Sequence, residues 1–208
     1  MTGIQEADEA LTITFLRNPV SRVISYCQHV SEGKSPHLRR EFPPETFDLD
    51  AFLRSGNVEL ANLQTRMLIE DQSTTTDPLG SMTPSAARDT ALENLLNRVF
   101  RFGLQELFDE SLLIFADALG WSLPLYAHLN KKNPRKLLEV NQHHIDQIRE
   151  LNAIDLEVYA RARGHFCDNL VPTIAALQVQ RFGRMQRLAA FPLLAMHYCT
   201  ELLSARRG

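Results

Sequence analysis

The chain has 208 residues, 44% of them hydrophobic and 23% charged, and its formal net charge is −3 at pH 7. This composition is typical of a soluble globular domain and argues against overall disorder. The small negative charge argues against a global attraction to nucleic acid or to an acidic membrane surface, so any anion site must be local. No apolar run reaches the roughly 18 residues of a transmembrane helix, and the acidic start MTGIQEADEA is unlike a signal or transit peptide.

The three cysteines, Cys27, Cys167 and Cys199, share no CxxC spacing. An odd number of unrelated cysteines favours free thiols in a reducing compartment. His143 and His144 are adjacent rather than one helical turn apart, which is a poor arrangement for a metal on a helix. We therefore expect a cytoplasmic protein without a metal site.

The first predicted elements are a strand and a helix. Residues 11–16, LTITFL, are rich in β-branched and aromatic side chains and predict a buried strand. Asn18 suits a helix N-cap, and Pro19 suits the first helical position because its missing N–H would be unpaired there anyway. The apolar residues that follow at helical spacing predict the buried side of this helix; they are Val20, Val23, Ile24, Cys27 and Val30.

The rest of the chain predicts mainly helices. They are expected over residues 47–54, 57–69, 85–97, 109–119, from 141 or 143, and 153–166, and the tail over 172–207 is expected to be mostly helical. A second strand is expected over 98–104. Loops are expected over 31–47, 71–84 and 130–136. Two strands are few for an α/β sheet, so the pattern predicts a helix-rich α/β fold that lacks strands. We expect one domain over residues 1–170 and a helical tail over 171–208.

The tail carries three arginines beside apolar residues. Arg181, Arg184 and Arg187 alternate with Phe182, Met185 and Leu188. Docking of this helix onto the domain is the first expectation. A dimer helix or a helix at a membrane surface is the alternative.

Arg17 stands at the joint between the first strand and the first helix. A helix N-terminus offers unpaired N–H groups and a partial positive charge, and arginine adds a planar fork of donors suited to phosphate. Ser25 lies roughly 10 Å further along the helix at 1.5 Å per residue, away from the apolar side. The pattern therefore predicts a phosphate held by Arg17 and Ser25. The competing interpretation is that Arg17 pairs with a carboxylate and Ser25 is an ordinary surface residue.

Four segments in order resemble the sulfotransferase family that includes the heparan sulfate 2-O-sulfotransferases and bacterial relatives. The first is the strand with Arg17, Asn18, Pro19, Arg22 and Ser25, which is similar to the family's 3′-phosphate-binding motif. The others are NLQTRML (62–68), FGLQELFDESLLIFADALGW (102–121), and the basic loop HLNKKNPRK followed by DLEVYARARGHF. The likeness extends from Leu11 to Phe166 and implies an incomplete P-loop-NTPase-like sulfotransferase fold with a short parallel sheet.

The resemblance implies that the chain binds 3′-phosphoadenosine 5′-phosphosulfate (PAPS) and transfers its sulfuryl group to a hydroxyl of a saccharide. It assigns Arg17 and Ser25 to the 3′-phosphate, Arg22 to the helix or the site, and Asn130 and Lys132 to a loop over the nucleotide. Two positions depart from the family pattern. Asn18 replaces an aspartate and so keeps the cap without its charge, and Gln105 replaces a threonine near the expected adenine.

Family members also carry a glycine-rich, lysine-containing loop for the 5′-phosphosulfate and, just before the 3′-phosphate strand, a Gly-His segment whose histidine is the candidate general base. Neither pattern is found in these 208 residues. Sulfuryl transfer needs charge stabilisation at the leaving phosphate and a base for the acceptor hydroxyl. Two interpretations follow: a truncated form of a longer sulfotransferase, catalytically incomplete as given, or a non-catalytic nucleotide-binding or interaction protein on a degenerate sulfotransferase fold. A nucleic-acid partner is not expected, because the basic loop is short and has no interleaved aromatic residues.

Overall fold

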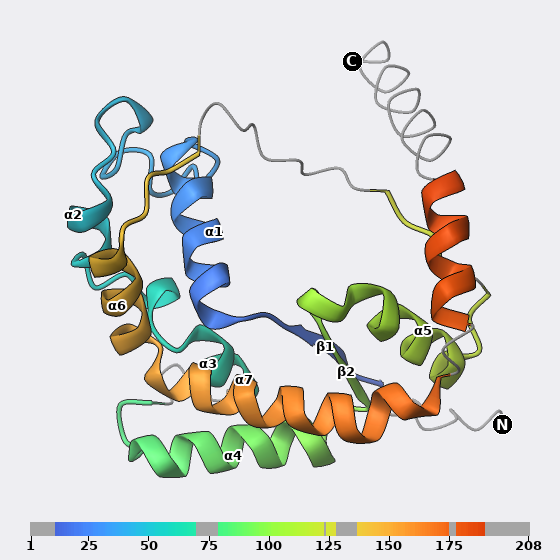
Figure 1. The fold of residues 1–208 in the computed structure, drawn as a ribbon. Coiled ribbons are helices and arrows are strands. Elements are labelled where there is room, and N and C mark those ends of the chain that lie inside the picture. Colours follow the sequence, from blue (N-terminus) through green and yellow to red (C-terminus); the bar gives the residue numbers. More distant parts are fainter. Residues whose placement is uncertain (1–10, 70–78, 123, 128–136, 175–177, 190–208) are drawn as a thin grey trace, which may run out of the picture.

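The computed structural model describes residues 11–69, 79–122, 124–127, 137–174 and 178–189. Within this part of the chain, strands β1 (Ile13–Leu16) and β2 (Arg101–Leu104) pair in parallel, with Ile13 opposite Arg101. The α-helices are α1 (Pro19–Ser31), α2 (Leu49–Leu53), α3 (Leu63–Ile69), α4 (Pro84–Asn97), α5 (Phe108–Leu119), α6 (Gln142–Leu151) and α7 (Ala153–His165) (Figure 1). Short single-turn helices lie at Pro44–Thr46, Val58–Leu60, Gln105–Leu107 and Val171–Thr173, and a π-helix lies at Phe166–Leu170. The predicted helix-rich α/β fold with a short parallel sheet is confirmed.

Two side chains explain where α1 begins. The Asn18 side-chain oxygen accepts a hydrogen bond from Ser21 N–H at 3.1 Å, and Pro19 occupies the first turn. Asn18 is therefore the predicted N-cap. The buried side of the helix is formed by Val23, Cys27 and Val30, as its spacing predicts. Burial raises the pKa of the Cys27 thiol to about 12, which makes this cysteine part of the core rather than a nucleophile.

The prediction of one continuous helix over residues 57–69 is wrong. A 3₁₀ turn over Val58–Leu60 and helix α3 are separated by Asn62, whose φ of 45° lies in the left-handed region. Asparagine tolerates this conformation better than most residues. Its side-chain oxygen accepts hydrogen bonds from the N–H groups of Ile154 and Asp155 at 3.0 Å each. The break in the helix thus places Asn62 over the N-terminus of α7.

The two strands are covered by helices on both faces. On one face Phe15 packs between Phe108 and Phe115 of α5, with ring centroids 5.1 and 5.2 Å apart. On the other, α4 and α7 run side by side beneath the strands (Figure 1). A second apolar cluster joins α1, α2 and α6 around Phe52. The strand ends and the start of α1 therefore lie between two packed cores.

Residues 178–189 form a helix that contributes to the main core. Phe182 is buried against that core, and the side-chain amide of Gln186 is hydrogen-bonded to the backbone N–H and C=O of Tyr126. Residues 190–208, the larger part of the tail predicted from sequence, lie outside the described residues. The domain boundary at residue 170 stays a prediction.

Gly103 in β2 is a glycine whose missing side chain we expect to matter for packing in the main core. A Cβ at this position would lie 2.7 Å from Phe15 Cε1 and 2.7 Å from Ser111 Cβ. We expect Gly103→Ala to lower the free energy of unfolding by about 1–3 kcal/mol, the usual cost of overpacking a filled core. Urea unfolding followed by circular dichroism measures it.

Gly164 in α7 is a matched control for this substitution. Nothing lies within 4 Å of a Cβ built there, and alanine is the better helix former by about 0.5–1 kcal/mol. Gly164→Ala should therefore stabilise the protein. If Gly103→Ala is as stable as the wild type, the close packing between β2, Phe15 and α5 is wrong.

Candidate functional site

Arg17 follows directly on β1, and its backbone is held by the side chain of Gln64 from α3. The Arg17 N–H donates to Gln64 Oε1 at 2.8 Å, and Gln64 Nε2 donates to the Arg17 carbonyl at 2.9 Å. This pair of bonds has the form that a neighbouring strand would supply. The Gln64 amide thus fixes the backbone of Arg17 without using its side chain.

The half-buried side chain of Arg17 has no hydrogen-bond or ion-pair partner among the residues that the structure describes. The competing interpretation from sequence, in which Arg17 pairs with a carboxylate, therefore finds no support in this part of the chain. A guanidinium is a cation with five donors at any physiological pH, and it favours bidentate contact with phosphate or carboxylate. An uncommitted arginine on a fixed backbone is suited to an anionic ligand.

The peptide group between Arg17 and Asn18, whose C=O bonds to Gln64, is also held at its N–H by Glu106, in the short helix after β2. Asn18 N–H donates to Glu106 Oε1 at 2.8 Å, and the Tyr159 hydroxyl donates to Glu106 Oε2 at 2.8 Å. Burial, and the bond to Glu106, raise the pKa of Tyr159 well above its ordinary value. Tyr159 is therefore a neutral donor that holds the carboxylate in place.

These bonds correct one expectation about the N-terminus of α1. We expected unpaired N–H groups there, but the N–H of Ser21 is taken by the Asn18 side chain and that of Asn18 by Glu106. Pro19 has no N–H. The helix dipole still favours an anion, but most of the hydrogen bonding to a ligand at this joint would have to come from side chains such as Arg17 and Ser25.

Arg22 lies within the scaffold around the site. Its guanidinium donates to the Glu59 carbonyl at 2.8 Å and to Asn152 Oδ1 at 3.3 Å. Burial lowers its pKa, which the nearby Asp155 and Glu59 partly offset. These contacts fit the expectation that Arg22 steadies the helix; a direct part in cofactor binding stays a prediction.

Ser25 is half-buried on α1, and no hydrogen bond of its side chain is found in the described part of the chain. It lies inside α1 (Pro19–Ser31), as the sequence predicts. Its assignment to a phosphate stays a prediction.

Asp155 connects the motif NLQTRML to α7. This carboxylate is 1% exposed and accepts from Thr65 N–H at 2.7 Å, from the Thr65 hydroxyl at 2.6 Å and from Gln64 N–H at 3.2 Å. Asn152, fully buried, accepts from Asn62 N–H at 3.1 Å and donates to Leu60 O at 2.7 Å. Asp155 thus supports Gln64, and Gln64 supports Arg17.

Sequence reasoning missed the roles of Gln64, Glu106, Asp155 and Tyr159. Gln64 and Glu106 lie inside segments that carried the family resemblance, which was the available signal. Their partners on α7, Asp155 and Tyr159, are four residues apart and so lie on one side of the helix. One helix therefore supports both side chains that hold the joint.

The remaining predicted positions add nothing to this site in the described part of the chain. Asn130 and Lys132 lie outside the described residues. Gln105 is exposed at the start of the 3₁₀ turn. His144 is committed to structure: its Nδ1 accepts from Asn141 N–H at 3.2 Å, and its Nε2 lies 3.3 Å from Asp50 Oδ1. In the described ranges no group of three or more metal-ligating side chains is found.

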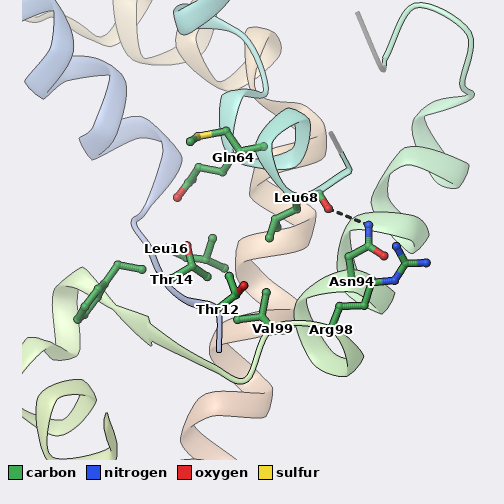
Figure 2. A pocket seen from close by; sticks show the side chains of 10 residues that line it. Thr12, Thr14, Leu16, Gln64, Leu68, Asn94, Arg98 and Val99 are labelled. Atoms are coloured by element: carbon green, nitrogen blue, oxygen red, sulfur yellow. Dashed lines mark hydrogen bonds between the residues drawn. The ribbon is translucent and has the colours of Figure 1, made fainter. Parts of the chain in front are cut away.

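A pocket of about 370 Å³ runs along β1 next to the joint. Figure 2 shows Thr12, Thr14 and Leu16 on one wall. The opposite wall comes from α3 and the end of α4, which are tied by a 2.8 Å bond from Asn94 Nδ2 to the Leu68 carbonyl. No residue of β2 lines it, and neither does Arg17, Arg22 or Ser25. The pocket therefore adjoins the predicted phosphate site through Gln64 but is not that site.

Comparison with known proteins gives one family. The family model described as galactose-3-O-sulfotransferase matches residues 5–191. No match was found among curated proteins. The family match bears out the sulfotransferase identification made from the motifs, but it does not extend to the particular likeness to heparan sulfate 2-O-sulfotransferases. In the described ranges no helix has the length and hydrophobicity needed to cross a membrane.

Proposed function

Because the chain belongs to the galactose-3-O-sulfotransferase family, we propose that it uses PAPS as donor and binds the 3′-phosphate of this nucleotide with Arg17 and Ser25. The family supports sulfotransferase activity and transfer of the sulfuryl group to a carbohydrate acceptor. The family description also suggests the acceptor, a galactose unit sulfated on its 3-hydroxyl. We assign residues to the 3′-phosphate end of the donor only.

One observation carries the phosphate assignment: the Arg17 guanidinium, which has no partner among the described residues, stands on a backbone that Gln64 fixes at both its N–H and its C=O. Two parallel N–H···O bonds from such a fork to phosphate oxygens are short, charge-assisted contacts. Because the backbone is already fixed, little conformational freedom remains to be lost when the ligand binds. The Ser25 hydroxyl adds a neutral donor from the next turns of α1.

Calorimetry with a set of nucleotides tests the proposal. Adenosine 3′,5′-bisphosphate should bind at least tenfold more tightly than adenosine 5′-monophosphate, a difference of about 1.4 kcal/mol. Adenosine 3′-monophosphate should also bind more tightly than adenosine 5′-monophosphate. Equal affinity for all three, or no binding by the folded protein, would contradict the 3′-phosphate site.

A transfer assay separates the enzyme from the alternative of a non-catalytic nucleotide-binding protein. Radiolabelled PAPS is offered with a β-galactoside and with its 3-deoxy analogue. Label should pass to the galactoside and not to the analogue. Selective nucleotide binding without transfer to any saccharide would favour the alternative.

A further inference from the structure

The joint between β1 and α1 is held by a carboxylate whose role neither the sequence motifs nor the family match assigns. Glu106 accepts the Asn18 N–H with one oxygen and the Tyr159 hydroxyl with the other, each at 2.8 Å. Gln64 bonds to the N–H and the C=O of Arg17. Gln64 and Glu106, which both lie outside β1 and α1, therefore hold the two peptide groups on either side of Arg17. We propose that Glu106, supported by Tyr159, is a positioning residue that aims Arg17 at the 3′-phosphate. This inference rests on the proposed function.

The geometry explains why a side-chain acceptor is useful at this place. Asn18 must present its side chain to Ser21 N–H as the N-cap, so its own N–H needs an acceptor from elsewhere in the fold. Glu106 is exposed, but its carboxylate accepts a hydrogen bond from the hydroxyl of Tyr159, a residue that is only 8% exposed. The carboxylate therefore has one defined direction rather than the many rotamers of a free surface glutamate.

The backbone at Arg17 affects the ligand because it sets the orientation of the Arg17 side chain. The peptide bond between Arg17 and Asn18 sets the direction in which the Arg17 side chain leaves the backbone. Gln64 holds the Arg17 N–H and C=O, and Glu106 holds the N–H that follows. If Glu106 is lost, this peptide keeps only the Gln64 bond to its C=O and can turn more freely. A misplaced guanidinium then contributes less to bidentate binding.

Three variants separate positioning from other roles. Glu106→Ala removes both bonds and should weaken binding of adenosine 3′,5′-bisphosphate about tenfold, with little effect on adenosine 5′-monophosphate. Glu106→Gln keeps an oxygen for Asn18 N–H and an amide donor toward the Tyr159 oxygen, so it should bind within about twofold of the wild type. Tyr159→Phe removes only the anchor and should weaken binding about threefold. Glu93→Ala, an exposed carboxylate of α4, is the control and should change nothing.

Hydrogen exchange of the backbone gives a readout that needs no ligand. In the free protein, Glu106→Ala should speed exchange at the Asn18 amide, whereas Glu106→Gln should not. Unchanged exchange, or unchanged nucleotide affinity in Glu106→Ala with a normally binding wild type, would overturn the positioning role. Tighter binding by Glu106→Gln would also overturn it, because it would mean that the negative charge opposes the phosphate. If the wild type shows no preference for the 3′-phosphate, the proposed function fails first and the inference falls with it, even where exchange responds.

Discussion

Asp155→Ala is expected to be the most destabilising single substitution around the site, lowering the free energy of unfolding by about 3–5 kcal/mol. Thr65 is fully buried, and both its N–H and its hydroxyl donate to this carboxylate. Removing the acceptor leaves these donors without a partner, at about 1–3 kcal/mol each. It also removes the charge that most offsets the burial of Arg22.

Asp155→Asn separates the charge from the hydrogen bonds. The amide oxygen can still accept from Thr65, but its NH₂ group would face the N–H of Gln64, so we expect a smaller loss of about 1–2 kcal/mol. Urea unfolding followed by circular dichroism and by Trp121 fluorescence measures both variants. Asp146→Ala is the control, because the contacts of Asp146 with Arg149 and Gln142 lie on the exposed surface of α6, and exposed ion pairs contribute about 0–1 kcal/mol.

Asp155→Ala that unfolds like the wild type would contradict the link between α3 and α7. If this variant does not fold at all, Asp155→Asn still gives the measurement, and a loss below that of Asp146→Ala would contradict the same link. A second readout follows from the chain of contacts. Gln64 receives one bond from Arg17 and donates its own N–H to Asp155, so Asp155→Asn should also weaken binding of the 3′-phosphorylated nucleotide severalfold.

The local elements of the fold could be predicted from short stretches of sequence. Strand β1, the Asn18 cap and the buried side of α1 depend on neighbouring residues and on helical or strand spacing. The break at Asn62 could not be predicted in this way. It depends on the N-terminus of α7, 92 residues further along the chain, which the Asn62 side chain caps. A left-handed residue with such a distant partner has no local pattern.

In the candidate site, too, some residues could be predicted from local sequence and others could not. Arg17 and Ser25 could be identified because the motif around them is local. The residues that hold Arg17 in place come from α3, from the turn after β2 and from α7, and a single sequence does not show which of its glutamines or glutamates reaches across the fold. The expectation of free N–H groups at α1 failed for Asn18 for this reason: its acceptor, Glu106, is 88 residues away.

Arg17→Ala is expected to lower the affinity for adenosine 3′,5′-bisphosphate about 100-fold, which corresponds to about 2.7 kcal/mol. Loss of two charge-assisted bonds accounts for this size. The affinity for adenosine 5′-monophosphate should hardly change, because that nucleotide lacks the 3′-phosphate. Isothermal titration calorimetry on the purified variant, at two salt concentrations, measures both.

Arg17→Lys tests whether binding needs the planar, two-pronged geometry of the guanidinium or only its positive charge. An ammonium keeps the positive charge but not the planar bidentate geometry, so about a tenfold loss is expected. Arg40→Ala removes the same charge from an exposed loop position and should bind like the wild type. Ser25→Ala should lose about three- to tenfold, as for one hydroxyl donor to a charged group.

The stability of Arg17→Ala distinguishes a ligand-binding residue from a structural one. Gln64 bonds to the Arg17 backbone, which alanine retains, and the guanidinium has no partner in the described part of the chain. The free energy of unfolding should therefore stay within about 0.5 kcal/mol of the wild type. A stable Arg17→Ala protein with undiminished affinity would remove Arg17 from the phosphate site. A large loss of stability would instead mean that its side chain supports the fold.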